Sequence, residues 1–174
     1  MHDELLTAVL RPYRPECRYL KEVTFEDPPV PGGMPSARGW FEIPKAFYIE
    51  DTGHFNAVEF ILCFNQIGYM LTAHCALSGA FPLVGVWSLD RFTANQLPNV
   101  LIVDVDVAFP RGIDARGFSG VVSIPWAEPR SRHLFYDMKI AFSDRAGGHA
   151  HGVIRVCLRN CIEQEASLAA AEMR

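Results

Sequence analysis

The sequence lacks the features that mark several large classes of protein. No apolar run approaches the roughly 18 to 20 residues that a helix needs to cross a bilayer. Acidic residues, Asp3 and Glu4, stand near the start, where a secretory signal would carry bases. Basic residues are in deficit and the net charge is −4, so a general nucleic-acid-binding surface is not expected. The sequence therefore predicts a cytoplasmic protein that engages neither membrane nor nucleic acid.

Cysteine usage and missing motifs exclude further kinds of chemistry. The five cysteines are scattered, and no pair has the CxxC spacing of a zinc ribbon or redox motif. Reduced structural thiols are therefore predicted. The chain has no GxSxG elbow, P-loop or GxGxxG fingerprint, which argues against a covalent serine mechanism. His149 and His151 could share one face of a strand, but no third ligand is suitably spaced, so no metal site is predicted.

One long stretch in the middle of the chain has few helix breakers. Phe55–Leu77 contains no proline and one glycine, Gly68, and Asn56 or Thr52 could cap its start. At 100° per residue, its large apolar side chains surround the helix on every side. Its polar residues make it a poor membrane span. A long central helix sealed inside protein is therefore expected.

Alternation of apolar and polar residues elsewhere indicates antiparallel strands. Arg18–Phe25 and Gly39–Ile43 precede the helix and flank a loop rich in proline and glycine. After Pro82 the pattern changes to strands again, starting with the short apolar run Leu83–Trp87. The later strands are expected at 103–109, 120–126, 134–143 and 152–158, with a helical connection at 92–98.

Two short strands, one long helix and a run of strands form an α+β layout. An antiparallel sheet wrapped around one long central helix, the hotdog fold, satisfies this layout. A single domain is expected over residues 1–174. It would include a helical N-terminal extension over about 1–14 and a C-terminal tail over about 162–174.

Two segments resemble the FcoT-like thioesterase family. Tyr48–Met70 contains the motif GHFN-x₈-N, and Gln96–Val103 (QLPNVLIV) enters a strand as in that family. The similarity runs from about residue 15 to about residue 160. The resemblance implies a hotdog fold assembled as a homo-oligomer, a dimer or higher, and a site lined by Tyr48, Asn56 and Asn65.

The family includes plain acyl-CoA thioesterases and enzymes of isonitrile lipopeptide and β-amino-acid macrolactam pathways. The latter add glycine to a 2-enoyl thioester and in some cases release the product by hydrolysis. Our first hypothesis is therefore addition of glycine, or a similar small amine, to the β-carbon of a fatty enoyl thioester, with thioester hydrolysis. No cofactor is implied beyond the CoA or phosphopantetheine of an acyl carrier protein that carries the substrate. The alternatives are a plain long-chain fatty acyl-CoA thioesterase and a non-catalytic hotdog that binds acyl chains or a carrier protein.

Both reactions push negative charge onto the thioester carbonyl oxygen. A helix start offers unpaired N–H groups and about half a positive charge, so the turn from Gly53 to Ala57 is predicted to hold that oxygen. Asn56 could cap the helix or orient water. His54 is the predicted general base, since an unperturbed imidazole titrates near neutral pH.

The remaining site residues carry more than one interpretation. Asn65, an amide inside an apolar helix, needs a partner, which could be a neighbouring strand, a second subunit or a ligand. Tyr48 could hold the carbonyl or a carboxylate. Glu59 could support His54 or act as an acid, and Glu26 could bind an amine, although a structural or solvated role is the default for both. Arg130, Arg132 and Arg145 could form a basic rim for the carrier's phosphates, although solvated loops are the default for these arginines.

Overall fold

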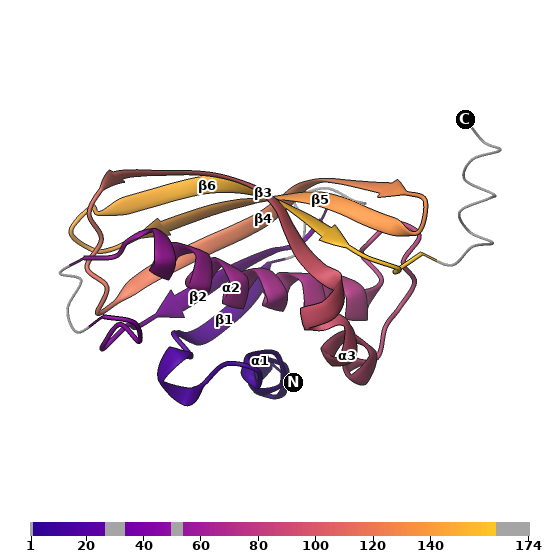
Figure 1. Cartoon of the computed structure of the whole chain (residues 1–174), viewed down its shortest axis with the longest axis horizontal. Helices are drawn as coiled ribbons and strands as arrows, with labels where there is room; N and C mark the ends of the chain where they lie inside the picture. The colour runs from indigo at the N-terminus through magenta and orange to yellow at the C-terminus, as the bar shows by residue number, and fades with distance from the viewer. Residues whose placement is uncertain (1, 27–33, 50–53, 163–174) are drawn as a thin grey trace.

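The fold is known from a computed structural model, which describes residues 2–26, 34–49 and 54–162. One antiparallel six-stranded sheet runs in the order β1-β2-β4-β5-β6-β3, so β1 and β3 are its edges. The described helices lie on one face of this sheet, with α2 against it and α1 and α3 farther out (Figure 1). The strands are β1 (Leu20–Glu26), β2 (Ser36–Phe41), β3 (Val100–Arg111), β4 (Phe118–Arg130), β5 (His133–Ser143) and β6 (His149–Leu158); the helices are α1 (His2–Leu10), η1 (Pro15–Cys17), α2 (Ala57–Ser78) and α3 (Leu89–Asn99).

The predicted central helix is confirmed as α2. Asn56 caps its start, whereas Thr52, the other proposed cap, lies outside the described residues. Gly79 ends it in a left-handed conformation, with φ 73°, which glycine adopts without steric cost. Small residues let the helix lie close to the sheet. A Cβ added to Gly39 of β2 would fall 3.1 Å from the Ile67 Cδ1 atom on α2.

The expectation that α2 is sealed on all sides is wrong for a single chain. Most of its side chains are buried, but one stripe is only partly covered. Val58 is 47% exposed, and Leu62, Asn65 and Tyr69 follow it at helical spacing as half-buried residues. By length and composition α2 could cross a membrane, yet two thirds of its apolar window is buried inside this fold. It is the core helix of the hotdog.

Strand β3 forms the edge beside the open stripe of α2. It pairs with β6 on one side, and no described strand pairs with its other side. Its inward-facing residues are poorly covered, as Ile102 is 39%, Val105 42% and Phe109 41% exposed. A long apolar edge of this kind is a surface on which another strand can pair. The exposed edge and the open stripe are neighbours, because Ile102 and Asn65 line the same small cavity.

One predicted strand is wrong and the others are confirmed with shifted ends. Leu83–Trp87 is the end of a turn followed by irregular structure, where Leu83 (φ 62°) and Gly85 (φ 71°) adopt left-handed conformations that no strand allows. The predicted helical connection is α3, which begins earlier, at Leu89, and accommodates Pro98 in its last turn. The predicted tail over 162–174 lies almost wholly outside the described residues.

A buried glutamine of α2 holds the first strand in place. Gln66 accepts the N–H groups of Tyr19 (3.0 Å) and Leu20 (2.9 Å) through Oε1. Its Nε2 donates to the Cys17 carbonyl over 2.7 Å. A buried side chain that satisfies three backbone groups fixes the start of β1 against the helix.

Candidate active site

The start of α2 is fixed by a reciprocal cap. Asn56 Oδ1 accepts the Val58 N–H over 2.8 Å, and Glu59 Oε2 accepts the Asn56 N–H over 3.2 Å. This capping box satisfies backbone donors that the helix cannot pair within itself. Exchange of such a cap for alanine typically costs about 1 kcal/mol. The asparagine and the glutamate therefore have a structural role before any chemistry is considered.

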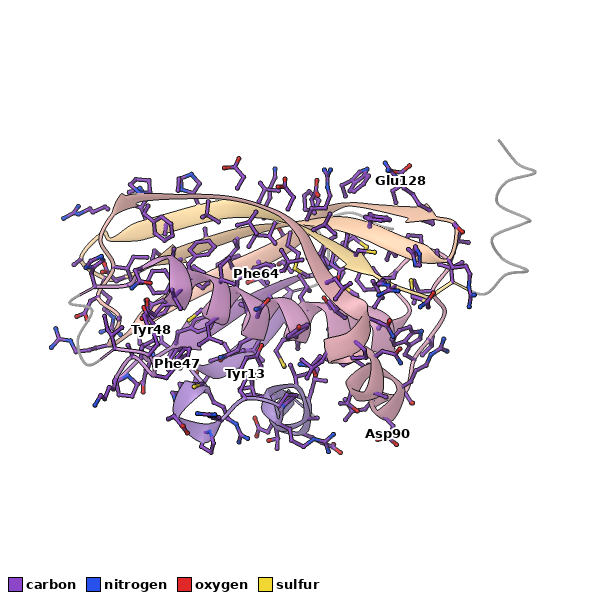
Figure 2. All side chains as sticks on the ribbon, in the orientation of Figure 1. Tyr13, Phe47, Tyr48, Phe64, Asp90 and Glu128 are labelled. Atoms are coloured by element: carbon purple, nitrogen blue, oxygen red, sulfur yellow. The ribbon has the colours of Figure 1, made fainter. Side chains whose placement is uncertain are left out.

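Tyr48 joins both cap residues from the preceding loop. Its hydroxyl donates to Glu59 Oε1 over 2.8 Å and accepts from Asn56 Nδ2 over 2.7 Å. Figure 2 shows Tyr48 below the first turn of α2, with Phe47 beside it. We call these three side chains the Tyr48–Asn56–Glu59 cluster. Within it the Asn56 amide uses one of its two N–H groups on Tyr48, so the second can reach a ligand.

The electrostatics of the cluster keep the phenol protonated. Glu59 is 1% exposed, and both its oxygens accept hydrogen bonds. Loss of solvent raises the pKa of Tyr48 above its ordinary value, and the Glu59 carboxylate raises it further, while the bond from Asn56 opposes the shift. Tyr48 is therefore a neutral hydrogen-bond donor at neutral pH. It is not a base.

A pocket opens beside this cluster, at the end of the sheet where β3 stops. Its volume is about 340 Å³, and His54 and Asn56 contribute to its wall. Phe55 anchors this part of the chain, because its ring packs 4.9 Å from that of Phe118 and its N–H donates to Ile113 over 3.3 Å. The lining residues are His54, Phe55, Asn56, Ala57, Phe109, Arg111, Gly112, Ile113 and Ala150.

The predicted oxyanion site needs a correction. Gly53 lies outside the described residues. The N–H groups of Phe55 and Asn56 already donate, to Ile113 and Glu59 respectively, so they are not open to an acyl oxygen in this arrangement. Two donors of the pocket lining are left without a partner among the described residues: the Ala57 N–H and the second N–H of the Asn56 amide.

Asn65 does not share this pocket within one chain. Nine residues of helix separate it from Asn56, which is a rise of about 13 Å and two and a half turns, so the two face opposite sides. Asn65 instead lines a small cavity between α2 and the β3 edge, together with Tyr69 and Ile102. Its amide makes no side-chain hydrogen bond among the described residues. No described strand therefore serves as the predicted hydrogen-bond partner of Asn65. The other two predicted partners, a second subunit and a ligand, stay possible.

The two carboxylates singled out in the sequence have different surroundings. Glu59 belongs to the cluster, as part of the cap and as the acceptor for Tyr48. Glu26 lies at the end of β1, where it is exposed and faces Arg38 at 3.8 Å and Ser36 at 3.5 Å. The structure therefore does not bring Glu26 to the cluster.

The three arginines of the predicted basic rim are also separated. Arg130 and Arg132 flank the β4–β5 turn, at the opposite end of the sheet from the start of α2 (Figure 1). Arg130 is engaged there by Glu128 at 2.9 Å. Arg145 lies in the β5–β6 turn, at the same end as the pocket. Sequence reasoning missed Arg111, the last residue of β3, whose only signal is its place between Pro110 and Gly112.

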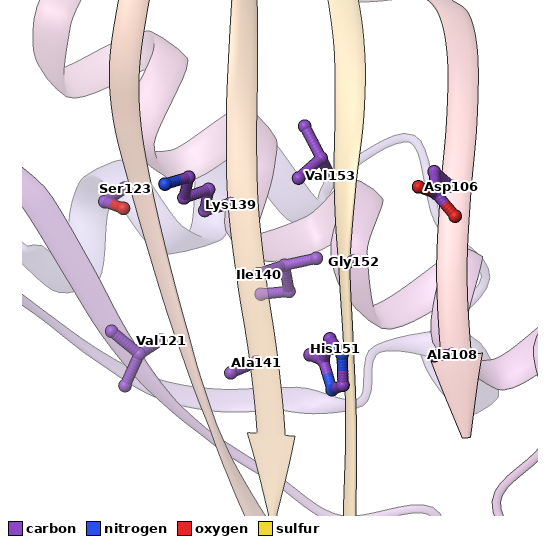
Figure 3. Close-up of a pocket in the computed structure, with 10 residues that line it drawn as sticks. All are labelled: Asp106, Ala108, Val121, Ser123, Lys139, Ile140, Ala141, His151, Gly152 and Val153. Carbon is purple, nitrogen blue, oxygen red and sulfur yellow. The ribbon is translucent and has the colours of Figure 1, made fainter. Parts of the chain in front are cut away.

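A second hollow, of about 590 Å³, lies on the face of the sheet that carries no helices (Figure 3). Its lining includes the small side chains of Ala108 on β3 and Ala141 on β5, together with Asp106 and Lys139. None of the predicted site residues contributes to it. The pocket at the start of α2 therefore remains the candidate active site.

The described residues offer no group of three His, Cys, Asp or Glu side chains that could hold a metal. All five cysteines are buried with free thiols. Burial raises the pKa of each, to about 12 for Cys75 and about 11 for Cys161, so none is an activated nucleophile at neutral pH.

A protein-family model and individual relatives of known description both match this chain. The FcoT-like thioesterase domain model matches residues 8–158. A (2E)-enoyl-[ACP] glycyltransferase of Streptomyces coeruleorubidus is 42% identical over 69% of this chain and 72% of that protein. Proteins of the same description from Mycobacterium bovis and Mycobacterium marinum are each 35% identical over 91% of this chain, and over 87% and 86% of their own lengths.

Solved structures confirm the hotdog fold at much lower sequence identity. A structure described as a thioesterase from Lactococcus lactis superposes with a TM-score of 0.55 at 7% identity, covering 81% of this chain and 94% of that one. A structure from Streptococcus pneumoniae, described as a thioesterase with coenzyme A, gives a TM-score of 0.52 at 6% identity over 94% and 100%. Both share the fold; the family relation comes from the sequence.

Proposed function

The chain belongs to the FcoT-like thioesterase family, and from this membership we propose that it adds glycine to the β-carbon of a 2-enoyl thioester and releases the product by hydrolysis. The relatives described as (2E)-enoyl-[ACP] glycyltransferases support this choice over plain hydrolysis. The structural observation that carries the proposal is the Tyr48–Asn56–Glu59 cluster at the start of α2, beside a pocket that also holds His54.

The addition step requires stabilisation of an enolate. The lone pair of the neutral amine attacks the β-carbon, a C–N bond forms, and the C=C π electrons move so that the carbonyl oxygen becomes negative. The proton lost by the nitrogen is returned to the α-carbon, so the net change is addition of N–H across the double bond. Hydrogen bonds aimed at the oxygen lower this barrier, and loss of one typically costs about 3 to 4 kcal/mol.

The cluster and the helix start are suited to that task. The second N–H of the Asn56 amide and the Ala57 N–H, at the positive end of the α2 dipole, are the donors we assign to the carbonyl oxygen. Tyr48 fixes the Asn56 amide by accepting from it, and Glu59 fixes Tyr48. These contacts hold the donors before substrate arrives, and such preorganisation is what makes them effective.

His54 is the group that we assign to proton transfer. It lines the same pocket as Asn56 and lies on the solvent-exposed side, where an amine or water can approach. As a base it would take the proton from the ammonium form of glycine. In hydrolysis it would take a proton from the water that attacks the carbonyl carbon; the C–S bond then breaks, and the carrier thiol leaves with a proton.

The active unit is proposed to be a homo-oligomer in which a second copy completes the site. No described strand pairs with the outer side of β3, and one stripe of α2 is half open. Val58, Asn65 and Val105 are therefore incompletely covered, and a second copy paired along β3 would cover them. Asn65 cannot face Asn56 of its own chain. Across a two-fold axis at β3, Asn65 of one copy would approach the α2 start of the other.

The carrier of the acyl chain and the cellular location of the protein are also proposed. The thioester is expected on an acyl carrier protein, as in the names of the relatives, with coenzyme A as the alternative carrier. A cytoplasmic location is proposed because the cysteines are all free and buried, which is the usual state of thiols in a reducing compartment. The whole chain, 1–174, is proposed to act as one domain.

Matched saturated and 2-enoyl thioesters, each incubated with and without glycine, test the proposal. The enoyl thioester should yield a glycine adduct, detected by mass spectrometry, and thiol release should depend on glycine. Equal release of both acyl groups without glycine would identify a plain thioesterase and contradict the addition step. No turnover in any mixture, together with retained thioester binding, would identify a non-catalytic acyl binder.

A further inference from the structure

Arg111 supplies the permanent positive charge in the described lining of the pocket. It ends β3 and lines the pocket with His54 and Asn56. Among the lining residues it is the side chain with a permanent positive charge. It forms no ion pair with any described acid, whereas the nearby Arg116 is held by Asp114 at 3.0 Å. The pocket lining thus includes a cation that no described acid pairs with.

The β5–β6 turn leaves room for this guanidinium. A Cβ added to Gly147 would lie 3.2 Å from Arg111 Nη1, so the glycine there permits the close approach. The acid of the same turn, Asp144, is occupied by backbone N–H groups of Asp114, Ala146 and Gly148. These hydrogen bonds hold the turn next to Arg111. Asp144 itself makes no ion pair with the guanidinium of Arg111.

The proposed amine donor carries a charge that the site must accommodate. Glycine attacks as a neutral amine, but its carboxylate stays anionic throughout the addition. That carboxylate would enter a pocket next to the buried acid Glu59, and without a cation the approach is unfavourable. An arginine fork matches a carboxylate with two parallel hydrogen bonds.

We propose that Arg111 binds the carboxylate of the amine donor and so makes the enzyme select an amino acid over a simple amine. This inference rests on the proposed function and adds the residue that recognises its second substrate. The carboxylate on Arg111 and the acyl carbonyl at the start of α2 would place the amine between them, next to His54. Arg111 is therefore a specificity-determining residue in direct contact with substrate.

The test compares glycine with glycinamide, which has the same amine and no carboxylate, as donors to one 2-enoyl thioester. The wild type should prefer glycine, and Arg111→Met should raise the KM for glycine about tenfold to hundredfold and abolish the preference. Arg111→Lys should fall between the two, because it keeps the charge and loses the fork. Arg155→Met, which removes an exposed arginine of β6 that pairs with Asp137 at 2.8 Å, is the matched control and should match the wild type.

The other outcomes separate this inference from the proposed function. If the wild type forms no adduct with either glycine or glycinamide, the proposed function itself is wrong. Adduct formation with an unchanged glycine preference in Arg111→Met would overturn only the role of Arg111. A rise in the KM for the thioester, with the KM for glycine unchanged, would also overturn it and would assign Arg111 to the phosphate of the carrier. Circular dichroism and melting temperature of each variant show that the comparison is between folded proteins.

Discussion

The hydroxyl of Tyr48 lies 2.8 Å from the Glu59 carboxylate, which it reaches from a loop that precedes the helix. The contact links a partly exposed aromatic ring to an acid that is 1% exposed. Glu59 is also the third residue of α2 and closes the capping box. One acid therefore serves both the start of the helix and the orientation of the predicted catalytic side chains.

The first prediction concerns that contact. Tyr48→Phe removes the donor to Glu59 and the acceptor of the Asn56 amide, so the amide should lose its fixed direction. Turnover should fall at least about tenfold, while the free energy of unfolding falls by about 1 kcal/mol. Steady-state kinetics and urea denaturation measure the two effects. Tyr19→Phe is the control, since its hydroxyl contacts Lys45 outside the cluster; unchanged turnover in Tyr48→Phe would remove Tyr48 from the mechanism.

A second prediction separates stability from catalysis. Gln66→Leu leaves the N–H groups of Tyr19 and Leu20 without their acceptor in a buried site, so the free energy of unfolding should fall by about 2 to 4 kcal/mol. The KM values should not change. Gln96→Leu is the matched control, because that side chain is equally buried but makes one hydrogen bond, to Val9, and its Oε1 has no partner in the described part of the chain. An equal loss in both variants would mean that the three bonds of Gln66 add nothing.

A third prediction follows from the buried thiols. Burial raises the pKa of Cys75 from 9.0 to about 12, so the unfolded chain releases this proton near pH 9 while the folded chain retains it. The free energy of unfolding should therefore fall as pH rises from about 9 toward 12, by up to about 1.4 kcal/mol per pH unit for each such thiol. Denaturation curves between pH 8 and 10.5 should give a shallower slope for Cys75→Ala than for the wild type. Parallel slopes would show that Cys75 does not titrate differently in the two states.

The exposed edge gives a fourth prediction. Val105→Lys places a charge on the inward side of β3, so pairing with a second copy should become unfavourable. Light scattering should then report a monomer, and turnover should fall with the loss of the partner's Asn65. Val153→Lys adds the same charge to a similarly exposed position on the opposite face of the sheet, and it should leave assembly intact. A fully active Val105→Lys monomer would contradict a site shared between copies.

The sequence predicted the elements of the fold well wherever local pattern and tertiary packing agree. The apolar stretch from Phe55 and its cap at Asn56 predicted α2 because a buried helix needs both features. The strand predicted at Leu83–Trp87 was wrong, because an apolar run alone does not reveal that Leu83 and Gly85 adopt left-handed conformations. The open stripe of α2 could not be predicted either, because hydrophobic periodicity does not show which apolar surface a single chain leaves uncovered.

The candidate site was predicted less completely, for a physical reason. Motif residues can be named one by one, but the Tyr48–Asn56–Glu59 cluster depends on how a loop folds back on the first turn of the helix. The same geometry occupies the Asn56 N–H, a donor that the sequence suggested for the acyl oxygen. Arg111 is brought to the pocket by the end of β3, which is far from the motif in sequence.

Donors at the start of α2 are proposed to polarise the acyl carbonyl, and the vibrational frequency of that carbonyl reports this polarisation directly. A 2-enoyl thioester labelled with ¹³C at the carbonyl, bound to a slow variant such as His54→Ala, should absorb at a lower frequency than the same thioester in water. The added change Asn56→Ala should move the band back toward the value in water. A band at the aqueous frequency when Asn56 is present would show that these donors do not act on the carbonyl oxygen.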